Sequence, residues 1–255
     1  MLISYKAVFI AAAIGVLPVF IWVWFLLKSH TFSFGSSNFI LKVFFWGVLT
    51  AVPASVFEII VIETQGGGQI IQTMQAIWNV QKTNIAFTVL VSTTLMAAIE
   101  ELSKGIGIGL AVLLKKVRSS NDGMVIGVLI GLAFGVTENG VYFASAMGTQ
   151  RGSDFLTIVL LRFILSTSAH IIYSSTMGTF LAEAFLSKNL SSKFLKIVLA
   201  FLLPVGIHSV FNLILNTAFS WLASIVILVG FVLLWMRYKG VARKEEQQRQ
   251  ELVTQ

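Results

Sequence analysis

The sequence predicts an all-α fold: a polytopic bundle of about seven transmembrane helices, with the N-terminus outside the cell and the C-terminus in the cytoplasm. The 255 residues are 56% hydrophobic and only 11% charged, whereas a soluble domain contains about 25% charged residues. Long apolar segments recur along the chain, and the loops between them differ strongly in their content of basic residues. These three observations together favour a multi-pass membrane protein.

The low charge content also excludes several classes of protein. So little polar surface cannot cover a soluble globule of this size, which rules out a cytosolic enzyme, a nucleic-acid-binding protein and a disordered chain. The net charge of +7 is then explained by basic cytoplasmic loops and not by a nucleic-acid partner. The absence of cysteine excludes a thiol nucleophile. The expected location is a bacterial plasma membrane, with the lipid bilayer as a partner.

Seven apolar segments are expected to cross the membrane, since about 20 helical residues span about 30 Å of hydrocarbon. The third and fifth segments are longer than this, which predicts that they tilt or project from the bilayer. The predicted spans are residues 7–27, 39–62, 85–114, 123–147, 155–186, 194–215 and 219–236.

Basic residues in the connections predict the orientation of the chain. The N-terminus and the second, fourth and sixth loops carry only Lys6, Lys82 and Arg151. The other loops and the C-terminal tail, or the span ends beside them, carry Lys28, Lys42, Lys115, Lys116, Arg118, Lys188, Lys193, Lys196, Arg237, Lys239, Arg243, Lys244 and Arg249. Because basic loops remain in the cytoplasm, an odd number of spans places the N-terminus outside.

Five titratable side chains lie deep inside predicted spans: Glu100, Glu101, Glu138, His170 and His208. A charge at the bilayer centre costs at least about 2.5–3.5 kcal/mol on insertion scales, so this group requires a compensating role. Four of the five, on four successive spans, lie at the same depth, about 21–24 Å from the cytoplasmic ends at 1.5 Å per residue. The sequence therefore predicts one polar site built by four helices.

Helical spacing predicts the neighbours of these side chains. Lys104 follows the two adjacent glutamates by three and four residues and can neutralise either one, and Asn212 shares a face with His208. Arg162 is expected to pair with Glu101 or to bind substrate carbonyl groups. A stripe of small residues on the fourth span predicts a close helix contact that holds Glu138 inside the bundle. That stripe consists of Gly123, Gly127, Gly131 and Gly135.

Four motifs follow one another on four successive predicted spans. They are Glu100-Glu101-Leu102-Ser103-Lys104, Phe134-Gly135-Val136-Thr137-Glu138-Asn139, the isolated His170, and His208-Ser209-Val210-Phe211-Asn212. In this order they resemble the PrsW-type family of intramembrane proteases and, more distantly, the CAAX prenyl endopeptidases and bacteriocin-processing membrane proteases. CAAX-type members have EExxxR and a histidine where this chain has Glu138, so their mechanism transfers poorly to Lys104 and Glu138.

The resemblance implies regulated proteolysis of a membrane-anchored protein substrate, such as an anti-sigma factor. On this interpretation residues 1–236 form one transmembrane domain with a catalytic core at about 85–215, and residues 237–255 form a charged cytoplasmic tail. Because peptide hydrolysis needs an activated water and a stabilised oxyanion, we predict Glu100 as the general base. The other predicted roles are Glu101 or His170 in orienting the water, Glu138 in orienting a histidine or the water, and His208 and Asn212 in binding the oxyanion.

Three alternatives remain open at this point. The same side chains can hold a catalytic zinc ion, in which case Glu138, His170 and His208 are the expected ligands. The hydroxyl groups around His170 offer a Ser–His dyad. From a different class, buried acidic and basic residues also build the proton relays of membrane transporters.

Overall fold

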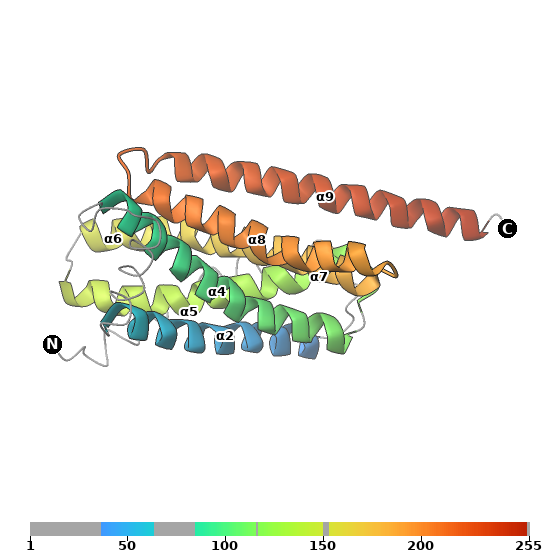
Figure 1. The fold of residues 1–255 in the computed structure, drawn as a ribbon, viewed down its shortest axis with the longest axis horizontal. Coiled ribbons are helices and arrows are strands. Elements are labelled where there is room, and N and C mark those ends of the chain that lie inside the picture. The colour runs from blue at the N-terminus through green and yellow to red at the C-terminus, as the bar shows by residue number, and fades with distance from the viewer. Residues whose placement is uncertain (1–36, 64–84, 116, 150–152, 254–255) are drawn as a thin grey trace.

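The computed structural model describes residues 37–63, 85–115, 117–149 and 153–253, and within these ranges every regular element is a helix (Figure 1). The helices are α2 (Ser37–Glu63), α4 (Ile85–Lys115), α5 (Ser120–Thr149), α6 (Ser153–Leu161), η1 (Arg162–Ser166), α7 (Thr167–Leu186), α8 (Leu190–Leu215) and α9 (Leu222–Val253). The predicted all-helical class is confirmed.

Five helices among the described residues are long and apolar enough to cross a membrane: Asn38–Val56, Ser120–Phe143, Phe155–Leu186, Leu190–Leu215 and Leu222–Arg243. The predicted span 85–114 is also a continuous helix, α4, but it is not one of the five, and it carries three charged side chains near its middle. The predicted span 7–27 lies outside the described residues. The count of seven spans therefore stays a prediction.

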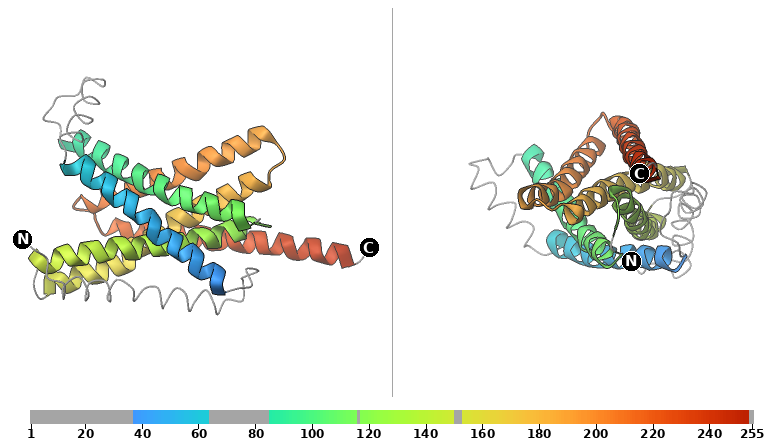
Figure 2. Two further views of the ribbon diagram at one scale, coloured as in Figure 1. Left: turned by 90° about the horizontal axis from the view of Figure 1, so that it is seen from below. Right: turned by 90° about the vertical axis from the view of Figure 1, so that its right-hand side faces the viewer.

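Two boundaries differ from the sequence prediction. Residues 155–186 do not form one regular α-helix, because a five-residue π-helix, η1, separates α6 from α7. The chain beyond residue 237, predicted as a charged tail, continues α9 as one helix to Val253. Figure 2 shows this helix extending past the rest of the bundle.

Successive rods of the bundle run in opposite directions, with α6, η1 and α7 forming one rod (Figure 1). As a consequence, the first residues of α2, α5 and α8 lie at the same end of the bundle as the last parts of α4, α7 and α9. We call this end the basic end. The described basic residues at this end are Lys42, Arg118, Lys188, Lys193, Lys196, Arg237, Lys239 and Arg243. This is the end predicted to face the cytoplasm, although membrane orientation itself stays a prediction.

Helices α5 and α7 form the centre of the bundle, and glycine lets their backbones touch. A Cβ atom added at Gly123, Gly127 or Gly131 would overlap the backbone carbonyl oxygen of Gly178, Ser174 or His170, respectively. The predicted close contact along the small-residue stripe is thereby confirmed. It fixes the position of His170 against α5.

Helix α9 packs on this centre through Ala223 and Ile227 near its start, which are buried with Ile172 and Tyr173 of α7, and through Arg237 at the basic end. The Arg237 guanidinium forms an ion pair with Glu183 of α7 and lies over the Phe180 ring, 4.6 Å from its centroid. Lys196 of α8 lies 3.8 Å from the same carboxylate. Most of the membrane-length part of α9 is exposed at the surface of the bundle, which suits a helix facing lipid.

Candidate active site

The two adjacent glutamates of α4, Glu100 and Glu101, have different surroundings. Consecutive residues lie about 100° apart around a helix, and as a result Glu100 lines a cavity whereas Glu101 is completely buried. Lys104, one turn further along, is also 0% exposed. Its Nζ lies 2.5 Å from Oε1 of Glu101 and 3.8 Å from Oε2 of Glu100. Lys104 is therefore the direct partner of Glu101, and Glu100 is the carboxylate that faces the cavity.

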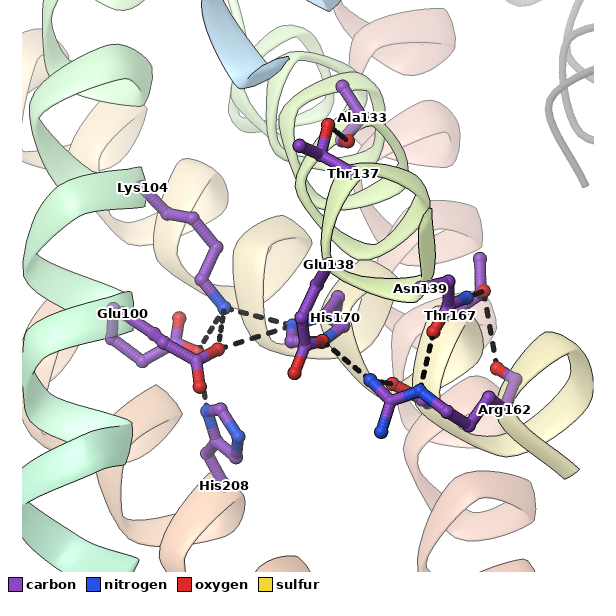
Figure 3. Close-up of polar contacts among 12 residues, drawn as sticks. Glu100, Lys104, Ala133, Thr137, Glu138, Asn139, Arg162, Thr167, His170 and His208 are labelled. Atoms are coloured by element: carbon purple, nitrogen blue, oxygen red, sulfur yellow. Dashed lines mark hydrogen bonds and ion pairs between the residues drawn. The ribbon is translucent and has the colours of Figure 1, made fainter. Parts of the chain in front are cut away.

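His170 of α7 connects α4 to α5. Its Nδ1 lies 3.1 Å from Nζ of Lys104, and its Nε2 lies 2.7 Å from Oε2 of Glu138 (Figure 3). An ammonium group can only donate a hydrogen bond, so Nδ1 accepts and the ring proton is on Nε2, which donates to Glu138. These contacts specify one neutral tautomer of His170.

His208 of α8 is held by the buried glutamate. Its Nδ1 lies 2.9 Å from Oε1 of Glu101, and because a carboxylate accepts, Nδ1 carries the proton that is donated. The imidazole ring stacks on Tyr173, with centroids 4.7 Å apart and planes 21° from parallel. Both residues line the same cavity as Glu100.

The π-helix η1 begins at Arg162 and positions its guanidinium beside Glu138. Nη2 lies 3.0 Å from Oε2 of Glu138, and Nε donates to Oδ1 of Asn139 at 2.9 Å. The Asn139 amide in turn donates to Oγ1 of Thr167 at 2.9 Å. The expected pairing of Arg162 with Glu101 is therefore wrong: Arg162 comes from the α6–α7 rod and reaches the carboxylate of the neighbouring α5. Asn139 was not predicted, although it directly follows Glu138.

The polar side chains form one continuous line of contacts across the bundle. It runs from Arg162 through Glu138, His170, Lys104 and Glu101 to His208 (Figure 3). Together with Glu100, three carboxylates face two cations. When both histidines are neutral, the cluster carries one net negative charge in a region that the sequence places within the hydrocarbon.

A cavity of about 600 Å³ opens beside this line of contacts. Its polar lining near the cluster includes Glu100, Glu138, Arg162, His170, His208 and Asn212. Beyond the cluster it is also lined by Ser92 of α4 and by Asn216, which directly follows α8, and both lie towards the end opposite the basic end. The cavity therefore connects the cluster to the end that is predicted to face outward.

The structure brings the predicted site residues together with one change in the candidate metal ligands. Donor atoms of Glu100, Glu138 and His170 all lie within 4.8 Å of one another. Glu100 takes the place predicted for His208, whose Nδ1 is directed at Glu101. Two carboxylates and an imidazole are donor types that zinc accepts, and the excess negative charge suits a cation, so the residues fit a metal ion, for which Nε2 of His170 would exchange the proton that it donates to Glu138.

Two of the hydroxyl groups near His170 are bonded to their own helix, whereas the buried Oγ of Ser174 has no hydrogen-bond partner among the described residues. Oγ of Ser175 donates to the Ile171 carbonyl at 2.6 Å, and Oγ1 of Thr176 donates to the Ile172 carbonyl at 2.8 Å. These bonds are typical of hydroxyl side chains inside helices. These two hydroxyl groups therefore give no support to a Ser–His dyad.

Comparison with known proteins identifies the family. A family model described as "PrsW family intramembrane metalloprotease" matches residues 35–237, which is most of the chain and includes every helix that contributes to the cluster. The chain belongs to the PrsW family. The resemblance inferred from four short motifs is confirmed, and the match extends well beyond the stretch from Glu100 to Asn212 that contains them.

Curated relatives in the PrsW family are bacterial proteins named Protease PrsW. The chain is 29% identical over 114 residues to the protein of Clostridioides difficile (45% of this chain and 46% of the relative) and 31% identical over 121 residues to that of Halalkalibacterium halodurans (47% and 51%). A third, from Shouchella clausii, is 28% identical over 121 residues (48% and 51%). The chain thus spans about half the length of the curated relatives it matches. No solved structure matches it.

Proposed function

We propose that this protein is an intramembrane peptidase that hydrolyses a peptide bond of a membrane-anchored protein. The observation that carries the proposal is the position of Glu100: its carboxylate faces a cavity inside a helix bundle and lies beside His170 and Lys104. Membership of the PrsW family supports the same activity.

In the proposed reaction, Glu100 accepts a proton from a water molecule as the water oxygen attacks the scissile carbonyl carbon. The tetrahedral intermediate carries its negative charge on the former carbonyl oxygen. Asn212 donates to this oxyanion through Nδ2, and His208 does so through Nε2 when its ring carries both protons. The C–N bond then breaks, and the proton held by Glu100 passes to the leaving amine.

The remaining charged residues position these groups. Glu101 binds both Lys104 and His208, and so fixes the imidazole at the cavity wall. Glu138 accepts from His170 and is itself held by Arg162. We assign positioning roles to Glu101, Glu138 and Arg162, because each acts on the cavity through another side chain.

In a second form of this proposal, the peptidase depends on a metal ion. Glu100, Glu138 and His170 would hold it, and a bound zinc ion would supply a water of lowered pKa at neutral pH. In either form Glu101 retains its role, since it contacts Lys104 and His208 and not the three candidate ligands.

The cavity indicates the kind of substrate. Its polar cluster is reached from the end of the bundle opposite the basic end, so the peptide bond enters from the outward-facing side of the membrane. A single-span protein with an unwound segment near that face, such as an anti-sigma factor, fits this access.

Reconstitution in liposomes tests the function. A panel of single-span peptides, each with a fluorophore and a quencher flanking its outer juxtamembrane segment, is incubated with the wild-type chain and with Glu100→Gln. Fluorescence gain with the wild type alone supports the peptidase. Proton or solute flux without cleavage would instead support a transporter, which the continuous line of polar contacts could also serve.

A further inference from the structure

Tyr173 is a buried residue of the site whose hydroxyl has no role in the mechanism described so far. Its side chain is only 1% exposed and is the largest of the fully buried side chains. The hydroxyl has no hydrogen-bond partner among the described residues. A buried polar group without a partner costs about 1–3 kcal/mol, so its presence requires an explanation.

The surroundings of Tyr173 are those of the reaction centre. The residue lines the cavity together with Glu100, and its ring stacks on His208 with centroids 4.7 Å apart. The His170 ring lies edge-on at 6.2 Å, and Nζ of Lys104 lies 5.8 Å from the centroid of the Tyr173 ring. The aromatic ring is thus fixed from several sides.

The two histidines that line this cavity offer no free donor for the oxyanion when their rings are neutral. The Nδ1 proton of His208 is committed to Glu101, which leaves Nε2 as an acceptor whenever the ring is neutral. His170 donates through Nε2 to Glu138 and accepts at Nδ1. A neutral hydroxyl, by contrast, always offers a proton.

We propose that Tyr173 is a catalytic residue whose hydroxyl donates a hydrogen bond to the oxyanion of the tetrahedral intermediate, together with Asn212. This inference rests on the proposed peptidase function. A donor without a partner in the resting protein gains its bond as negative charge forms on the substrate oxygen, and such a bond stabilises the transition state more than the bound substrate. The hydroxyl oxygen is itself buried in the resting protein, so neighbouring side chains have to shift to admit the substrate oxygen, but no hydrogen bond to the protein has to break first.

The test is Tyr173→Phe, measured with the panel peptide that the wild type cleaves fastest. The ring that stacks on His208 is retained, so only the hydroxyl is lost. We expect kcat to fall about 100- to 1,000-fold, the usual effect of removing one oxyanion donor, while KM is unchanged. Tyr238→Phe on α9 is the matched control, and its kcat should equal that of the wild type.

A second readout separates catalysis from structure. A trifluoromethyl ketone based on the same peptide hydrates to a tetrahedral diol that can ionise and so mimics the oxyanion, whereas the corresponding peptide alcohol is tetrahedral but carries only one neutral hydroxyl. Tyr173→Phe should weaken binding of the ketone by the factor lost in kcat and leave binding of the alcohol and the melting temperature unchanged. A melting temperature that falls together with the affinities for both compounds would indicate a structural role and overturn the proposal.

The outcomes distinguish this inference from the function on which it rests. If the wild type cleaves and Tyr173→Phe cleaves at the same kcat, the role of Tyr173 is refuted while the peptidase stands. If the wild type cleaves no peptide of the panel, the peptidase and the role of Tyr173 are both refuted.

Discussion

Nε2 of His170 lies 2.7 Å from Oε2 of Glu138, and this contact joins the two helices at the centre of the bundle. The same oxygen of Glu138 lies 3.0 Å from Nη2 of Arg162. One carboxylate oxygen therefore receives a neutral donor from α7 and a cationic donor from η1. A single acceptor therefore neutralises the charge of Arg162 and orients the imidazole of His170.

The first prediction concerns the coupling between Glu138 and Arg162. Glu138→Gln and Arg162→Gln each leave one charge without its partner in a partly buried site, so each should destabilise the protein, and the double variant should be less unstable than the sum of the two. We expect an interaction free energy of about 0.5–3 kcal/mol, measured by unfolding in bicelles. Glu138→Gln combined with Glu183→Gln at the basic end is the control and should be additive. If the effects of Glu138→Gln and Arg162→Gln add, the two side chains do not form a direct ion pair.

The second prediction separates the adjacent glutamates of α4. Glu100→Gln should reduce cleavage at least about 100-fold, as expected for loss of a general base, and leave the unfolding free energy unchanged. Glu101→Gln should lower the unfolding free energy by about 3–5 kcal/mol, because it leaves the fully buried Lys104 without its nearest counter-charge. Cleavage rates and unfolding curves of both variants check this. If Glu100→Gln instead lowers stability and Glu101→Gln abolishes cleavage without loss of stability, Glu101 is the base and Glu100 the structural partner of Lys104.

The site could be located from the sequence because the rise of a helix is fixed. Glu100, Glu138, His170 and His208 lie at similar distances from predicted span ends, and the structure brings them to one cluster of side chains. The small-residue stripe likewise predicted a close helix contact, and the structure shows that the partner is α7. Both inferences use geometry that each helix carries by itself.

Two features depend on packing and could not be inferred in this way. Which of Glu100 and Glu101 faces the cavity depends on the rotation of α4 against α7 and α8, which is set by the neighbouring helices and not by α4 alone. The π-helix at 162–166 contains no proline or glycine that would mark it. The extra residue in that turn changes the direction of Arg162 relative to a regular α-helix, and the structure pairs it with Glu138.

The third prediction tests the contact between α5 and α7. Gly131→Ala would place a methyl group against the backbone carbonyl of His170, so the helices must separate and His170 must move away from Glu138. We expect a loss of about 1–3 kcal/mol in unfolding free energy and a strong loss of cleavage. Gly109→Ala on α4 is the matched control: no atom lies within 4 Å of the added methyl group, and alanine is favoured over glycine in a helix by about 1 kcal/mol. A stable and active Gly131→Ala variant would show that the helices are not in contact there.

The fourth prediction distinguishes the two sets of metal ligands by metal content. The structure groups Glu100 with Glu138 and His170, whereas the sequence favoured His208 in place of Glu100. If the protein holds zinc through the structural set, elemental analysis of the purified chain should find about one zinc per chain in the wild type and in His208→Ala, and much less in Glu100→Gln and His170→Ala. A chelator should then remove the metal and the cleavage together, and zinc should restore both.

Zinc retained in Glu100→Gln but lost in His208→Ala would favour the other ligand set. Cleavage by a metal-free wild-type chain would leave Glu100 as the base acting on an unbound water, because its carboxylate faces the cavity whether or not an ion is present.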